Sequence, residues 1–391
     1  MTFKNPFPPK AFSWAFYDFA NTIFSAIVVT VYLPLYMANL TGKNTPLGVA
    51  ATLSMILSGL VIPSLGALTD RTGKTKLYLF MSTALCVVTT SIISFTHSSA
   101  IILILFMAAN FLYHASLVFY NSLLPLVAPP EKQGLVSGLG TGLGYLGVLF
   151  ALPIAHQVDT CYERRWVFLL AGIMFFIFSL PLFIQVPERR VSHPMGNSLR
   201  KSLSLLLENK SFLYLLLGNF FLLDVLNAFI LWISVLLVKS FSLSQSALIQ
   251  TILALNASAF LFGILLGKWT DQIGYKKILL VSMAALAAVI LVAGLKFPVY
   301  WVRFSIILFG GMSAAGIWTA GRKGVAAMAP EERIGEFFGL YGFTTKVSAI
   351  GSTAIPLLAD HFGFQTAVLS QLASLVCAYL FIRKIPDSEN Q

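Results

Sequence analysis

The chain has 391 residues with a net charge of +11; 57% are apolar, 10% are charged, and the mean hydropathy is +0.83. An average soluble domain is about 25% charged, so this composition excludes a soluble enzyme, a nucleic-acid-binding domain and a disordered scaffold. A helix that crosses the hydrocarbon layer needs about 20 residues, and about twelve such helices would use most of the chain. The sequence therefore predicts an all-α, multi-pass membrane protein.

Twelve hydrophobic segments follow one another along the chain. The first six are predicted at 11–38, 47–68, 77–96, 100–127, 134–156 and 166–186. The second six are predicted at 211–238, 245–267, 278–296, 300–327, 336–359 and 363–383. A longer polar connection separates the two sets. The predicted organisation is a six-helix bundle over 1–186, a cytoplasmic linker over 187–210 and a second six-helix bundle over 211–391.

The positive charge is distributed unevenly between the two ends of these helices. With the N-terminus inside, 19 of the 26 Lys and Arg residues fall at the inner ends, six fall at the outer ends, and one, Lys346, falls within a helix. Because cytoplasmic loops are enriched in Lys and Arg, this bias predicts that both termini are cytoplasmic. The three cysteines are too few and too scattered for a disulfide framework or a metal site. We expect no cofactor and no metal.

Two sequence patterns recur at an offset of 201 residues. The first pattern occurs in the loop after the second helix and again in the loop after the eighth. Its residues are Gly66, Asp70, Arg71, Gly73 and Lys74 in the first copy and Gly267, Asp271, Gly274 and Lys277 in the second. The second pattern is Pro130-Glu131-Lys132-Gln133-Gly134, which recurs as Pro330-Glu331-Glu332-Arg333. Two independent matches at one offset indicate two homologous halves.

The repeated Gly-x-x-x-Asp-x-x-Gly pattern resembles the signature loop of the major facilitator superfamily. Trp14-Ala-Phe-Tyr17-Asp18-Phe-Ala-Asn21 further resembles the opening of its vacuole-effluxer-like branch, which includes the autophagy-associated vacuolar amino-acid effluxers. The resemblance implies a major facilitator fold of twelve transmembrane helices in two pseudo-symmetric halves, alternating access around a site between the halves, and movement of amino-acid-like solutes. The signature loops would then act in gating, with Asp70 facing the positive N-terminal end of a neighbouring helix; the simpler interpretation is a basic loop that follows the positive-inside rule.

Acidic and amide side chains occupy the first helix of each half. Asp18 and Asn21 lie three residues apart, as do Asp224 and Asn227, so each pair shares one helix face. A charge at mid-bilayer costs at least about 2.5–3.5 kcal/mol and calls for a partner or an aqueous cavity. Two interpretations stay open: interhelical hydrogen-bonded clusters, or acids that line the central cavity and couple to protons or cations.

Lys346 lies near the midplane of the predicted eleventh helix, and its counterpart at the 201 offset is Tyr145. A buried lysine must pair with a carboxylate or lose its proton. Asp18, Asp224 or a solute carboxylate could serve as that partner. A permanent structural ion pair is the alternative to a functional role.

Further polar residues in predicted helices are Asn110, His114, Asn121 and Arg322. His114 could relay protons or be simply hydrogen-bonded. Arg322 matches Asn121 at the 201 offset and could bind an anionic solute or reach the cytoplasmic surface. Gly142, Gly144 and Gly147 spell a dinucleotide fingerprint, but without the strand that it requires. The spacing of four in the pairs 138/142 and 140/144 favours close helix packing.

No nucleophile, base and acid are grouped, so an enzyme is not expected. We predict a secondary transporter in the bacterial inner membrane for a small polar, amino-acid-like solute, with proton coupling left open. The candidate solute-binding and coupling residues are Trp14, Tyr17, Asp18, Asn21, Asn110, His114, Asn121, Tyr145, Asp224, Asn227, Arg322 and Lys346. The expected partners are the solute, protons and membrane lipids, without nucleic acid, for a monomeric protein. The alternatives are a lipid or lysolipid flippase and a non-transporting receptor of the same fold.

Overall fold

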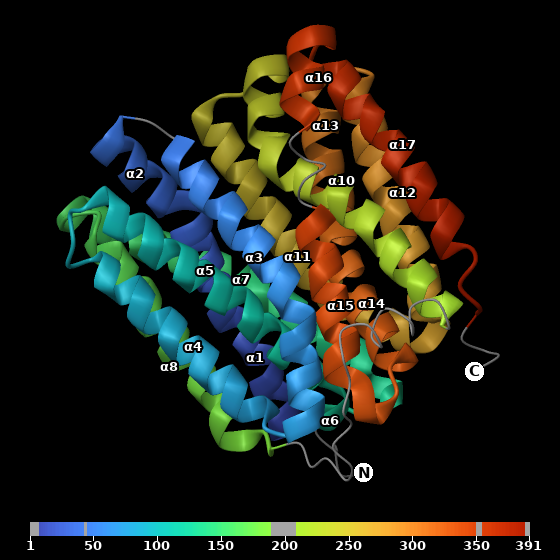
Figure 1. The fold of residues 1–391 in the computed structure, drawn as a ribbon. Helices are drawn as coiled ribbons and strands as arrows, with labels where there is room; N and C mark the ends of the chain where they lie inside the picture. The colour runs from blue at the N-terminus through green and yellow to red at the C-terminus, as the bar shows by residue number, and fades with distance from the viewer. Residues whose placement is uncertain (1–7, 43–44, 189–208, 349–353, 388–391) are drawn as a thin grey trace, which may run out of the picture. The chain divides into compact units, whose positions relative to one another are not determined.

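The structure is a computed structural model, and it describes residues 8–42, 45–188, 209–348 and 354–387. Every regular element in these ranges is a helix (Figure 1). The described part thus has the all-helical fold that the composition predicts. Most of the predicted linker at 187–210 lies outside the described residues.

The first six predicted segments correspond to a continuous series of helices. The series comprises α1 (Pro9–Phe24), η1 (Ser25–Tyr32), α2 (Leu33–Thr41), α3 (Thr45–Thr72), α4 (Thr75–Ile93), α5 (Ser99–Ser122), α6 (Leu124–Val127), η2 (Pro130–Lys132), α7 (Gln133–Cys161) and α8 (Trp166–Gln185). The first membrane segment is therefore three consecutive pieces, of which the middle one, η1, is a π-helix of 8 residues.

The second series repeats this order. It comprises α10 (Lys210–Phe241), α11 (Gln245–Ile273), α12 (Tyr275–Gly294), α13 (Val299–Ser305), η3 (Ile306–Gly310), α14 (Gly311–Met328), η4 (Glu331–Arg333), α15 (Ile334–Val347), α16 (Ala354–Phe362) and α17 (Phe364–Ile382). Here the π-helix, η3, lies in the tenth membrane segment. Neither π-helix was predicted, because an extra residue in a turn leaves the hydrophobic run unchanged.

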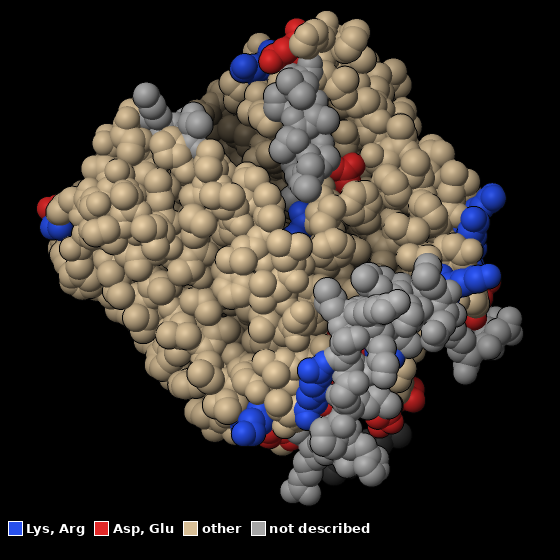
Figure 2. Space-filling view, in the orientation of Figure 1, with Lys and Arg blue, Asp and Glu red and all other residues tan. Residues whose placement is uncertain are grey.

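Eleven helical segments in the described ranges are long and apolar enough to cross a membrane. The predicted segment at 336–359 is represented by α15 and α16, with 349–353 outside the description. On the face shown in Figure 2, charged side chains form small groups separated by broad uncharged surface. The chain is accordingly a multi-pass integral membrane protein.

The helices form two compact units. The first comprises residues 1–129, 143–197 and 329–343, and the second comprises residues 130–142, 198–328 and 344–391. Each unit therefore contains a short piece of the other sequence half: the start of α7 packs in the second unit, and most of α15 packs in the first.

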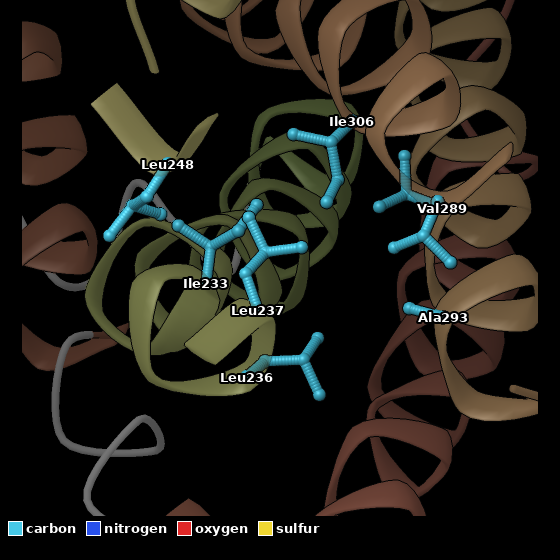
Figure 3. Packing of buried hydrophobic residues seen from close by; sticks show 8 residues of the cluster. Ile233, Leu236, Leu237, Leu248, Val289, Ala293 and Ile306 are labelled. Carbon is cyan, nitrogen blue, oxygen red and sulfur yellow. The ribbon is translucent and has the colours of Figure 1, made fainter. Parts of the chain in front are cut away.

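Within each unit, long helices pack side by side around an apolar interior. In the first unit α1 packs against α8, and α4 against both α5 and α8. In the second unit α10 packs against α17, and α12 against both α14 and α17. The side chains of Ile233, Leu237 and Val289 belong to a buried cluster of the second unit (Figure 3).

Candidate functional site

The signature loop of the first unit binds the beginning of α15. The Asp70 carboxylate accepts hydrogen bonds from the backbone N–H of Gly335 at 2.9 Å and of Glu336 at 2.7 Å. These N–H groups belong to the first turn of the helix, which has no intrahelical acceptors for them. Gly66 lies so close to the Gly335 carbonyl that a Cβ atom would overlap it. Glycine thus allows the helices to approach, and Asp70 neutralises the positive end of the helix dipole.

The second unit repeats this arrangement at the beginning of α7. The Asp271 carboxylate accepts hydrogen bonds from the N–H groups of Gly134 and Leu135, each at 2.7 Å. A Cβ atom on Gly267 would lie 2.7 Å from the Gly134 carbonyl oxygen. Each of these residues is displaced by 201 from its counterpart in the first unit, so the repeat extends from sequence to individual hydrogen bonds.

Glycine is also required at the turn that follows each aspartate. Gly73 and Gly274, again 201 apart, adopt φ values of +68° and +91°, which L-residues with a side chain rarely adopt. The basic residues Arg71, Lys74 and Lys277 are exposed beside these turns.

The four candidate residues of α1, Trp14, Tyr17, Asp18 and Asn21, are all buried in the first unit. Asp18 is 8% exposed and accepts a hydrogen bond at 2.9 Å from the Asn21 amide, as their spacing of three allows. Trp14 stacks on Tyr120 and donates its indole N–H to the Tyr120 carbonyl at 2.8 Å. The Tyr17 hydroxyl lies 2.6 Å from Thr83 Oγ1. The pattern that resembles the effluxer branch thus includes packing residues as well as an acid.

The other candidates of the first unit differ in their surroundings. The Asn110 amide donates to Ser54 Oγ at 2.6 Å, and His114 is buried with its ring 5.0 Å from that of Tyr113. Asn121 and Tyr145 are half-buried.

In the second unit, Asp224 and Asn227 have different hydrogen-bond partners. Asp224 accepts a hydrogen bond from the Ser374 hydroxyl of α17 at 2.9 Å, whereas Asn227 donates to the Ser348 hydroxyl at 3.3 Å. The half-buried Lys346 lies in the last turn of α15, two residues before Ser348. Within the described part of the chain, neither Lys346 nor Asp224 forms an ion pair, with each other or with another residue.

Arg322 extends from α14 towards the first turns of α7. It is 5% exposed, and its Nη2 donates to the Ser137 carbonyl at 3.2 Å and to the Thr141 hydroxyl. The neighbouring Lys323 donates to the Pro130 carbonyl. Both cations thus contact the stretch 130–142, from η2 into α7, that belongs to the second unit.

Sequence analysis missed two polar sites of the second unit. Asn219 is fully buried, and neither polar atom of its amide has a hydrogen-bond partner among the residues that the structure describes. The 201 offset pairs Asn219 with Asp18, and this signal was overlooked because Asp224-x-x-Asn227 reproduces the local spacing of Asp18-x-x-Asn21. Ser374 and Gln371 of α17 gave no signal, since polar residues are common in membrane helices. In the described ranges, no three His, Cys, Asp or Glu side chains are grouped as metal ligands would be.

Comparisons with known proteins agree on one family. The family model described as Major Facilitator Superfamily matches residues 15–265 and 237–391. The uncharacterized MFS-type transporter YxiO of Bacillus subtilis (strain 168) is 24% identical, with 96% of this chain and 94% of YxiO aligned. A homolog of the multi-drug resistance efflux pump PmrA from Lactococcus lactis subsp. lactis (strain IL1403) is 22% identical over 95% of this chain and 94% of its own.

Solved structures show the same fold at lower identity. The human organic anion transporter MFSD10 superposes with a TM-score of 0.78 at 14% identity, covering 96% of this chain and 100% of its own. A bacterial homologue of the iron transporter ferroportin, in an outward-facing state, superposes with a TM-score of 0.77 at 16% identity. The match covers 97% of this chain and 99% of the homologue. At these identities the likeness concerns the fold alone.

Proposed function

This chain belongs to the major facilitator superfamily, and from that premise we propose that it is a secondary transporter for a small zwitterionic, amino-acid-like solute. The family comprises membrane transporters and is not a class of enzymes. The substrate and the coupling ion are the parts that we propose.

Lys346 is the observation that carries the proposal. It lies deep in a membrane segment, and no carboxylate pairs with it in the described part of the chain. A cation in this position is costly unless an anion or water compensates it. The carboxylate of a bound solute would supply the anion. The half-buried Asn227 amide donates one N–H to the Ser348 hydroxyl, two residues after Lys346, and its second N–H could donate to the same carboxylate.

Asp18 is the residue that we propose to bind the coupling proton. Its carboxylate is almost fully buried and accepts a hydrogen bond from Asn21. In this mechanism the solute carboxylate binds at Lys346, and the proton binds at Asp18.

The two signature loops are the proposed gating elements. Each joins a helix of one sequence half to the start of a helix of the other half, through Asp70 to α15 and through Asp271 to α7. Alternating access requires the two halves to separate at this end in one of the two states. These hydrogen bonds would break in that state and so stabilise the other.

We place both termini on the cytoplasmic side of a bacterial inner membrane. The excess of Lys and Arg at the inner ends supports the orientation, and the bacterial relatives support the location.

The test is transport by purified protein in proteoliposomes. A panel of radiolabelled amino acids identifies the solute, and Lys346→Ala is expected to abolish its uptake, because the variant lacks the cation for the solute carboxylate. Lys239→Ala removes an exposed lysine from the end of α10 and serves as the matched control with wild-type uptake.

Other outcomes distinguish the alternatives. Uptake by Lys346→Ala at the wild-type rate would reduce Lys346 to a structural residue. Binding of a solute without accumulation under any gradient would indicate a receptor. Movement of a fluorescent lysolipid between leaflets, without solute uptake, would indicate a flippase.

A further inference from the structure

A small apolar cavity lies inside the second unit. It has a volume of about 50 Å³ and is lined by residues of α10, α12, η3, α16 and α17. Figure 3 shows Leu236, Val289, Ala293 and Ile306 around this space, and all four line it. A cavity with such walls holds water poorly and accepts apolar groups. Gln371 of α17 is the polar exception in the lining.

Two buried oxygen atoms accept no hydrogen bond within the described part of the chain: one belongs to Gln371, which lines the cavity, and the other to Asp224, which is bonded to α17 one turn from Gln371. Asp224 Oδ1 and Gln371 Oε1 are both buried and without a partner in the described part of the chain, although the other Asp224 oxygen is bonded to Ser374. Gln371 and Ser374 are three residues apart on α17, so they share the face that meets Asp224. Both oxygens are acceptors, and burying a carboxylate without compensation is expensive. A hydrogen-bond donor with positive charge would satisfy them together.

Hydrogen bonds, rather than position on α10, distinguish Asp224 from the residue near Lys346. Asp224 accepts a hydrogen bond from Ser374 of α17, one turn from Gln371 in the cavity lining. Asn227 donates instead to Ser348, two residues after Lys346. The amine site proposed below uses the α17 partners of Asp224, whereas the proposed solute site uses Lys346 and Asn227.

We propose that the second unit contains a binding site for short apolar organic amines. The ammonium group donates hydrogen bonds to Asp224 Oδ1 and Gln371 Oε1, and the alkyl group occupies the cavity. An inorganic cation would need further oxygen ligands or water, which the apolar wall does not provide. A neutral alcohol would fill the cavity but leave the carboxylate without a counter-charge.

The test is ligand-induced stabilisation of the full-length protein in detergent micelles, measured as a shift in melting temperature. The probes are n-alkylamines of increasing chain length, with n-alkanols and n-alkanoates of equal length as matched compounds. We expect stabilisation by the amines, with affinity rising about fourfold per methylene until the cavity is full. Asp224→Asn should weaken amine binding about tenfold or more, because it removes a charge-assisted hydrogen bond. Asp360→Asn changes an exposed aspartate of α16 and should leave amine binding unchanged.

A second variant tests the cavity without touching the carboxylate. Ala228→Leu places a larger side chain in the lining and should abolish the dependence on chain length, while Lys346→Ala should leave it intact. Equal stabilisation of wild type and Asp224→Asn by amines would overturn the proposal. Equal effects of amines and alkanols would also overturn it, and would indicate a protonated Asp224. Protection by Na⁺ that depends on Asp224, without protection by amines, would replace the site by an inorganic cation site.

Discussion

Single residues of this protein show how a buried charge obtains, or lacks, a partner. Asp224 and Asn227 share a spacing that suggests one cluster, yet they bond to different segments: Asp224 to Ser374 of α17, and Asn227 to Ser348, which follows α15. Asp18 and Asn21 have the same spacing and bond to each other at 2.9 Å. Spacing of three therefore allows a contact without determining it, since rotamer and neighbouring helices decide which partner is reached.

At this scale we predict that Asp18→Asn removes the pH dependence of transport. Asparagine keeps the size of the side chain and can still accept a hydrogen bond from Asn21, but it cannot exchange a proton. Counterflow of the identified solute in proteoliposomes, measured from acid to mildly alkaline pH, should give a flat profile with appreciable activity retained. Asp360→Asn is the control, and a wild-type pH profile in Asp18→Asn would exclude Asp18 as the coupling group.

Among the elements, the helix starts are where the two sequence halves meet. The first turn of α15 donates two backbone hydrogen bonds to Asp70, and the first turn of α7 donates two to Asp271. Charge at a helix N-terminus is typically worth about 0.3–1 kcal/mol, and up to about 2 kcal/mol when partly buried. Two such contacts, worth about 0.6–2 kcal/mol together, would shift a conformational equilibrium by about threefold to thirtyfold.

We therefore predict that Asp70→Asn favours the state in which α15 is released from α3. The reporter is a cysteine introduced as Ile334→Cys in a cysteine-free background, because Ile334 is buried at the start of α15. The rate of maleimide labelling should rise several-fold in Asp70→Asn and rise further when Asp271→Asn is added.

Gly66→Ala provides an independent way to open the same contact. Its Cβ would overlap the Gly335 carbonyl, so labelling of the reporter should rise although Asp70 is intact. Wild-type labelling rates in both Asp70→Asn and Gly66→Ala would contradict the gating role of this loop.

For the whole molecule, the orientation in the membrane can be tested with a native cysteine. Cys161 is exposed, whereas Cys86 is buried, and the distribution of Lys and Arg puts Cys161 on the outer side. A membrane-impermeant maleimide should label the wild-type protein in intact cells, and Cys161→Ser should remove this labelling.

The opposite side requires an introduced cysteine. Thr72 is exposed beside the signature loop, so Thr72→Cys in the Cys161→Ser background should be labelled only after the cells are permeabilised. The reverse pattern for the two positions would place both termini outside.

The sequence alone predicted the helical membrane fold and its internal repeat. Hydrophobic length and a fixed offset of 201 residues are properties of the linear chain, and they do not depend on how the helices pack. The same offset, applied to α10, also connects Asp18 with the buried Asn219, although the local Asp-x-x-Asn pattern concealed this pairing.

Only the tertiary structure decided which residues meet. Asp70 and Gly335 are 265 positions apart, and Asp224 and Ser374 are 150 positions apart, so no local pattern could pair them. Three other features also depend on packing between distant segments. They are the two π-helices, the assignment of the start of α7 to the second unit and the cavity that Gln371 lines. The physical reason is that hydrophobicity selects which segments enter the membrane, whereas close packing and the need to satisfy buried polar groups determine how those segments face one another.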